Sequence, residues 1–298
     1  MGRPSEETAR TPVGGAVAAL AAEILKDART AFETPGRSDA VAVHDFRKAM
    51  KRWRALLRLV KPTVGGEAER LRVVARDLAR DLAAARDGQA ALDAFADLLK
   101  GDTGLSPRTV TTITGRLEAL RTDAESTSLT EETRARVADA LDEAAAALAD
   151  WPFDDMKFFD LAAALTTGYR RARKAIPDDW AEADAEEVHD LRRCVVVHRY
   201  QMDLAVPLWP RFGKLWVGEA QRLRDRLGTC QDIAMLEGLM APHGPLTRWR
   251  HRLAPLVAAR RAVHVAAASR LAARLFAEKP RAFRRRLLAL GESAHDAD

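Results

Sequence analysis

Cysteine is almost absent from this 298-residue sequence, which contains only Cys194 and Cys230. Two cysteines cannot form a disulfide framework, and because both lie in helical patterns we interpret them as small buried side chains. No apolar segment is long enough to cross a bilayer. The apolar stretch from Val13 to Leu25 is interrupted by Glu23 and does not resemble a signal peptide. These absences predict a soluble cytoplasmic protein.

Motifs of nucleotide-dependent and nucleophilic enzymes are also lacking. There is no Gly-rich nucleotide loop of the Walker kind and no dinucleotide fingerprint, and Cys230 has no recognisable base beside it. Glu186 and His189 have the i, i+3 spacing of a metal-binding helix, but Val41 occupies the matching position before His44. A di-metal site in a helical bundle needs this motif twice, with further carboxylates. The sequence therefore predicts a protein without catalytic residues, metal ions or cofactors.

Alanine, leucine, arginine and the two acidic residues dominate the sequence, a balance that favours an all-helical protein. The net charge of +5 is modest for the length, so the position of the charges matters more than their sum. Arginine is frequent, and its rigid fork of donors suits phosphate. The apolar periodicity and the proline and glycine breaks predict helices at 12–32, 39–61, 67–86, 90–100, 107–124, 130–150, 156–176, 182–206, 214–240, 246–278 and 281–290.

The segment 151–155, with the sequence W-P-F-D-D, is predicted to join two halves of the chain. Within the first half we expect Pro62 to end the second helix and Asp87-Gly88 to bend the chain after the third. Short connections between helices favour bundles. We therefore predict an all-α fold of two sequential helical bundles, residues 12–150 and 151–290, related by a pseudo-two-fold axis.

An internal repeat links the two halves. Residues 43–87 align with residues 188–232 without a gap, and eleven of the forty-five positions are identical. Roughly four identities would arise by chance in a chain of this composition, so duplication is the better interpretation. The most similar stretches are V-H-D-F-R-K and V-H-D-L-R-R, which contain His44 and His189. We expect the halves to superpose with one histidine over the other.

Basic residues recur at three- and four-residue intervals after each histidine, which places them on one face of each helix. Such a face can simply be solvated, but its like charges repel one another, and few acids intervene. Closely spaced cations attract a chain of phosphates, and a histidine can donate to it in either protonation state. We therefore predict that both halves share one anionic ligand. The residues predicted to hold it are Lys26, Arg29, His44, Arg47, Lys48, Lys51, Arg54, Arg171, Lys174, His189, Arg192, Arg193 and Arg199.

Two other functions stay open at this point. Nucleic acid is the main alternative, because any basic surface attracts a phosphate backbone. Aromatic platforms among the basic residues are scarce, however, since Trp53 and Tyr200 lie in apolar stripes typical of core packing. A histidine-dependent phosphohydrolase or phosphotransferase is a third hypothesis, and the lack of a convincing carboxylate cluster for a metal argues against it.

The ordered set of motifs resembles the CHAD family, the conserved-histidine α-helical domains. The first repeat reads H-x-x-R-x-x-x-K-R-x-R from His44, close to the family's H-x-x-R-x-x-x-R-R-x-R, and the second keeps H-x-x-R from His189. The dipeptide R-D at Arg86 and the stretch L-G-T-C-Q-D from Leu227 are similar to the family elements that close the third helix of each half. The resemblance covers about residues 12–290.

This resemblance implies two four-helix bundles around a basic channel that binds inorganic polyphosphate without catalysis. Some family members are fused to a triphosphate-tunnel domain, whose Glu-x-Glu-x-Lys motif is absent here, so a stand-alone polyphosphate-binding protein is expected. The expected partners are inorganic polyphosphate and its cytoplasmic granules, with nucleic acid a weaker candidate and no membrane involved. The chain departs from the family pattern at Val196 and Val197, where basic residues are usual, so the basic density differs between the halves.

Overall fold

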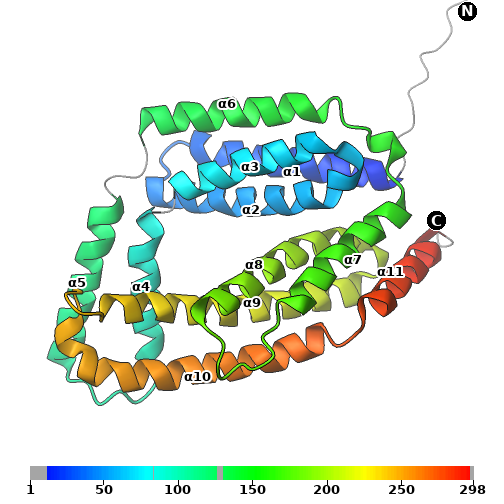
Figure 1. Cartoon of the computed structure of the whole chain (residues 1–298). Coiled ribbons are helices and arrows are strands. Elements are labelled where there is room, and N and C mark those ends of the chain that lie inside the picture. The colour runs from blue at the N-terminus through cyan, green and yellow to red at the C-terminus, as the bar shows by residue number, and fades with distance from the viewer. Residues whose placement is uncertain (1–11, 83, 126–129, 296–298) are drawn as a thin grey trace, which may run out of the picture.

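The computed structural model describes residues 12–82, 84–125 and 130–295, with defined side chains at 13–82, 89–122 and 130–292. These residues form helices joined by turns, and no strand occurs among them, which confirms the all-α prediction (Figure 1). The α-helices are α1 (Pro12–Glu33), α2 (Asp39–Val64), α3 (Gly66–Asp81), α4 (Ala84–Leu98), α5 (Pro107–Glu125), α6 (Glu131–Leu148), α7 (Phe158–Lys174), α8 (Ala185–Met202), α9 (Pro210–Leu239), α10 (Arg250–Leu275) and α11 (Pro280–His295).

Helices α1, α2, α3 and α6 pack together in the upper part of Figure 1, and we call them the first helix group. Helix α2 supplies its core because apolar residues recur along one face, among them Phe46, Met50, Trp53 and Leu57, all of which are buried. The ring of Trp53 stacks on that of Trp151, which follows α6, with their centroids 5.9 Å apart. This packing leaves the basic side of α2 directed away from the core.

Helices α7, α8, α9 and α11 form the second helix group around buried aromatic rings. Tyr169 stacks on Phe283 with ring centroids 4.2 Å apart, and its hydroxyl donates to the Glu278 carbonyl at 2.9 Å. The two groups meet where α2 contacts α7 and α8 (Figure 1). The basic side of α2 and the basic residues of α7 and α8 are therefore brought to the same boundary.

Helices α4 and α5 come from the first half of the sequence but pack against α9 and α10 of the second half (Figure 1). They share a separate apolar core, to which α4 contributes Phe95, α5 contributes Ile113, α9 contributes Leu236 and α10 contributes Leu253. The chain thus crosses between the two helix groups before the joint at 151–155.

Several expected helix boundaries differ from those of the structure, most clearly around Pro62 and Asp87. Pro62 does not end α2, which continues to Val64. A proline so close to a helix end removes only one backbone hydrogen bond, and the helix stops instead at Gly65, whose φ of 78° suits glycine and whose N–H donates to the Lys61 carbonyl. Helix α3 ends at Asp81 rather than at residue 86, and the expected bend at Asp87-Gly88 lies inside α4.

The buried His198 predicts an acid-sensitive core. It is fully buried among aromatic rings and accepts a hydrogen bond from Trp216 Nε1 at Nε2, at 3.1 Å, and burial lowers its pKa to about 3. Between its unfolded pKa of 6.5 and this value the unfolded chain binds a proton that the folded chain excludes. The free energy of unfolding should therefore fall by about 2 kcal/mol from pH 7 to pH 5 through this group alone.

Urea denaturation of the variant His198→Gln at the two pH values tests this prediction. Glutamine can accept the Trp216 hydrogen bond but does not titrate. The variant should therefore lose about 2 kcal/mol less stability than the natural chain over the same interval. An equal loss in both proteins would show that His198 is not the source of the acid sensitivity.

Candidate functional site

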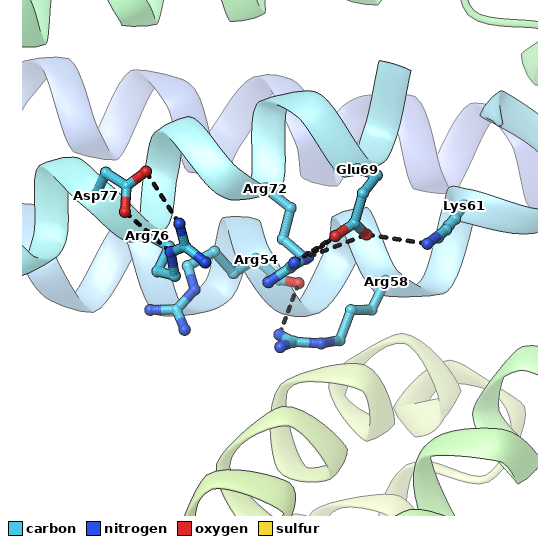
Figure 2. Close-up of polar contacts among 7 residues, drawn as sticks. All are labelled: Arg54, Arg58, Lys61, Glu69, Arg72, Arg76 and Asp77. Carbon is cyan, nitrogen blue, oxygen red and sulfur yellow. Dashed lines mark hydrogen bonds and ion pairs between the residues drawn. The ribbon is translucent and has the colours of Figure 1, made fainter. Parts of the chain in front are cut away.

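Four arginines lie together on the first helix group where it approaches the second. Arg54 and Arg58 lie one turn apart on α2, and Arg72 and Arg76 lie one turn apart on α3. Because α2 and α3 pack as a hairpin joined at Gly65, these side chains share one side of the pair. Figure 2 shows Arg54 and Arg58 extending from α2 towards the green helices of the second half.

The charges of these arginines act on one another and on the second helix group. Burial, and after it the positive charges of Arg72, Arg54, Arg171 and Arg193, together lower the pKa of the half-buried Arg58 to about 10. The α7 residue Arg171 and the α8 residue Arg193 are both exposed. Guanidinium groups on three other helices are therefore close enough to lower the pKa of Arg58. A cation in this position is destabilised unless an anion joins it.

The pKa of Arg54 is lowered in the same way, first by burial and then by the charges of Arg72, Arg76 and Arg193. Its Nε atom is buried and has no hydrogen-bond partner within the described part of the chain. No ion pair among the described residues involves Arg54, Arg58 or Arg171. Together, the arginines of α2 and α3 and the two arginines of the second helix group that act on them form a set of six, which we call the arginine cluster. Its members are Arg54, Arg58, Arg72, Arg76, Arg171 and Arg193.

Carboxylates partly neutralise the remaining members of the arginine cluster. Arg72 donates to Glu69 through Nε at 3.1 Å and through a short bond from Nη2, and Lys61 Nζ lies 3.0 Å from the same carboxylate. Arg76 pairs with Asp77 at 2.9 Å (Figure 2). On α8, Arg193 pairs with Asp190 at 3.0 Å. The uncompensated positive charge is therefore concentrated at Arg54, Arg58 and Arg171.

The structure brings three of the predicted ligand residues, Arg54, Arg171 and Arg193, into the arginine cluster. On α2, the exposed Lys48 and the half-buried Lys51 precede Arg54. Four other predicted residues are exposed, and ligand contact by them stays a prediction. They are Lys26, His44, Lys174 and His189. Both histidines lie in the second turn of their helices.

Arg47 and Arg192, which the repeat aligns, each tie their helix to the next one. Arg47 Nη1 on α2 donates to the Ala79 carbonyl near the end of α3. Arg192 Nη1 on α8 donates to Gln231 Oε1 on α9, and Gly228 leaves space for the guanidinium. A Cβ at position 228 would lie 3.3 Å from Arg192 Nη2. Part of the donor capacity of each arginine is therefore used within the protein.

Two further predicted residues contact neighbours outside the arginine cluster. Arg29 pairs with Asp142 on α6 and with Glu33 one turn along α1, so it links α1 to α6. The Arg199 guanidinium lies over the ring of Tyr200, 4.1 Å from its centroid. The superposition of His44 on His189 stays a prediction, and the side chains of the R-D element at 86–87 lie outside the described residues.

Sequence reasoning left Arg58, Arg72 and Arg76 out of the predicted site. The repeat aligns Arg72 with Val217 and Arg76 with Gln221, so a search for basic residues in matching places passes over both. Their own i, i+4 spacing after the turn at 65–66 was the available signal, because a helical hairpin brings such a row beside the basic face of α2.

Neither cysteine lies in an environment that activates a thiol. Burial raises the pKa of Cys230 to about 11 and also raises that of the half-buried Cys194, so both thiols are weak nucleophiles at neutral pH. Across the described ranges, no three histidine, cysteine or acidic side chains are grouped so that they could hold a metal ion. Among the helices at 12–82, 84–125 and 130–295, none has the length and apolar character needed to span a membrane.

A second basic region lies in the C-terminal helices. Residues 245–291 contain twelve arginines and lysines and a single acidic residue, Glu278. Near the start of α10, Arg250 and Arg252 are exposed. This region belongs to neither α2 nor α3, so it lies apart from the arginine cluster.

Comparisons with known proteins agree on the fold. A model of the CHAD domain matches residues 16–241. The solved structure of PptA from Streptomyces chartreusis is similar over 90% of this chain and 100% of its own, with a TM-score of 0.66 and 19% identity. The CHAD domain from the plant Ricinus communis is similar over 94% of this chain and 93% of its own, with a TM-score of 0.52 and 18% identity. No curated protein sequence matches the chain.

Proposed function

The chain belongs to the CHAD domain family, and from this premise we propose that it binds inorganic polyphosphate without catalysing its conversion. The proposed site is a basic channel centred on the arginine cluster, between two bundles related by a pseudo-two-fold axis. The proposed location is the cytoplasm, at polyphosphate granules. Polyphosphate is the ligand that the family resemblance implies, and the chemistry of the cluster suits it independently.

The observation that carries the proposal is the repulsion within the arginine cluster. Arg58 is half-buried beside four other guanidinium groups, and its pKa is lowered to about 10. Burial of unpaired like charges is costly, so the arrangement favours an anion that can contact several guanidinium groups at once. Polyphosphate carries a negative charge on every unit and accepts bidentate hydrogen bonds from arginine.

The cluster also gives a reason for one ligand to contact both halves. Arg54 and Arg58 belong to the first helix group, whereas Arg171 and Arg193 belong to the second, and their charges act on one another. A linear polyanion at this boundary would neutralise both sets. We therefore propose that the chain of phosphates runs between α2 and α3 on one side and α7 and α8 on the other.

Nucleic acid is the second candidate because residues 245–291 are strongly basic. Two observations disfavour it at the arginine cluster. Trp53 is buried in the core, with 2% of its surface exposed, so it cannot stack on a base. Tyr200 is half-buried, and the Arg199 guanidinium covers its ring.

A competition assay at one salt concentration tests the ligand class. Long-chain polyphosphate, single-stranded RNA and single-stranded DNA would each displace a labelled polyphosphate from the protein. We expect polyphosphate to bind at least about tenfold more tightly than either nucleic acid, and its affinity to fall steeply with salt because several ion contacts form together. Equal or tighter binding of RNA or DNA would favour the second candidate, and release of orthophosphate would contradict a purely binding role.

A further inference from the structure

Glu69 places a negative charge at one end of the arginine cluster. Its carboxylate accepts hydrogen bonds from Arg72 on the next turn of α3 and from Lys61 at the end of α2. Figure 2 shows this carboxylate between the two cationic side chains, on the side of α3 that also carries Arg76. Glu69 therefore bridges the two helices that provide most of the cluster.

The carboxylate of Glu69 uses the donors that a phosphate at Arg72 would need. Arg72 presents Nε and Nη2 to Glu69, the two nitrogens of one edge of its guanidinium fork. Among the neighbouring charges that lower the pKa values of Arg54 and Arg58, the charge of Arg72 has the largest effect on both. The hydrogen bonds from Arg72 and Lys61 hold the pKa of Glu69 at about 2, so it stays ionised throughout the physiological pH range.

Asp77, the acid on α3 that pairs with Arg76, restrains its arginine less than Glu69 restrains Arg72. The Arg76 side chain is 47% exposed, whereas that of Arg72 is 17% exposed. Arg76 can therefore leave Asp77 through solvent, whereas Arg72 is largely shielded from solvent. Of the two acids, Glu69 has the greater influence on the donors available to a ligand.

We propose that Glu69 is a built-in competitor for the polyanion site, an internal anion that lowers the affinity of the arginine cluster for polyphosphate. In the free protein it offsets part of the repulsion among Arg72, Arg54 and Arg58. When a polyanion binds, its oxygens must replace the carboxylate at Arg72 and Lys61 or lie close to a like charge. The inference rests on the proposed function, because it assigns a regulatory residue to the same site.

Glu67 provides a matched control on the same helix. It also pairs with an arginine three residues later, and Arg70 donates to it at 3.0 and 2.7 Å. Arg70 pairs in turn with Glu143 on α6, so the Glu67 carboxylate faces the other side of the first helix group. The variant Glu67→Gln removes the same charge from α3 without touching the arginine cluster.

The test compares Glu69→Gln, Glu67→Gln and the natural chain in titrations with long-chain polyphosphate and, separately, with single-stranded RNA. Glutamine keeps an oxygen that can accept from Arg72 but removes the charge. We expect Glu69→Gln to bind polyphosphate about two- to fivefold more tightly at low salt, a gain that corresponds to the free energy of an exposed ion pair. The salt dependence of the binding constant should also become steeper. Glu67→Gln should bind as the natural chain does.

A conservative variant separates charge from shape. Glu69→Asp keeps the negative charge on a shorter side chain, so it should not bind more tightly than the natural chain. Circular dichroism would verify that all the variants fold. Weaker or unchanged binding by Glu69→Gln would contradict the inference and make Glu69 a residue that positions Arg72 or has no role in binding.

The two probes distinguish failure of this inference from failure of the proposed function. If the natural chain binds RNA but not polyphosphate, and Glu69→Gln strengthens RNA binding, the proposed ligand is wrong and the competitor role stands. If polyphosphate binds but Glu69→Gln gives no gain, the proposed function stands and the competitor role is wrong. If neither polyanion binds the natural chain, the arginine cluster is not a polyanion site and both fail.

Discussion

Replacing both Arg54 and Arg58 with glutamine is expected to weaken polyphosphate binding by about thirty- to a hundredfold at low salt. Each residue would contribute a charge-assisted contact, and the two contacts together correspond to about 2.5 kcal/mol. The salt dependence of the binding constant should become shallower, because about 0.7 counterions are released per contact in single-stranded polyanions. Titration calorimetry at two salt concentrations measures both effects.

The same double variant should be more stable than the natural chain. Arg58 has a pKa lowered to about 10, against 12.5 for a free guanidinium, so folding disfavours its charged form. At pH 7 the group is protonated in both states and the folded protein bears the penalty, which is relieved only as the pH rises above about 10. Glutamine removes the penalty at neutral pH, and after allowance for solvent screening the gain should be about 1 kcal/mol.

A control on α10 distinguishes the arginine cluster from basic charge in general. Arg250 and Arg252 are exposed near the start of that helix, and replacing both with glutamine removes the same net charge. This variant should keep polyphosphate affinity within about threefold, since distant exposed charges are screened at ordinary salt. Equal losses in the two double variants would mean that the ligand binds over the whole basic surface.

Replacing Asp97 with alanine should destabilise the protein by about 3 kcal/mol, the cost of leaving the half-buried Arg260 and the buried His264 without their shared acceptor. Asp97, on α4, is 8% exposed and accepts two hydrogen bonds from Arg260 on α10, at 2.7 and 2.9 Å. It also lies 2.7 Å from His264 Nε2, and Arg226 on α9 lies 3.2 Å from Nδ1 of the same ring. The network therefore fixes α4 to α9 and α10.

The charge state of this network determines how the effect depends on pH. Hydrogen bonds from Arg260, His264 and Lys100 hold the pKa of Asp97 below its usual range. The stabilisation is therefore complete above the unfolded pKa of 3.8 and is lost only as the pH falls below it towards the folded value. Urea denaturation at pH 7 measures it in full.

Asp93 is a matched control for Asp97 on the same helix. It is exposed and accepts one hydrogen bond from Gln89 at 2.8 Å. Asp93→Ala should change the free energy of unfolding by no more than about 0.5 kcal/mol. A loss as small as this in Asp97→Ala would contradict a role for the network in holding α4 and α5 against the second half.

Most helices could be predicted from the sequence, because apolar periodicity and capping residues are local signals. Thr130, for example, begins the predicted helix 130–150, and in the structure it is the N-cap and accepts a hydrogen bond from the Thr133 N–H. The partners of α4 and α5 could not be predicted, since an apolar face does not identify the helix that covers it.

The candidate site shows a comparable limit. Arg54 was predicted because the repeat preserves it as Arg199, whereas Arg72 and Arg76 have no basic counterpart and were missed. Arg47 has a counterpart, Arg192, but each of the two donates to an acceptor within the protein. A guanidinium fork suits a carbonyl oxygen as well as a phosphate. The repeat therefore indicates which basic positions are shared by the two halves, but it does not show which of them contact a ligand and which connect helices.

The central claim is that one polyphosphate chain is held between the two helix groups by the arginine cluster. A crystal structure with polyphosphate of defined length tests it most directly. We predict phosphate oxygens within hydrogen-bonding distance of Arg54 or Arg58 and, along the same chain, of Arg171 or Arg193. Polyphosphate bound along α10 and α11, or on one helix group alone, would contradict the claim.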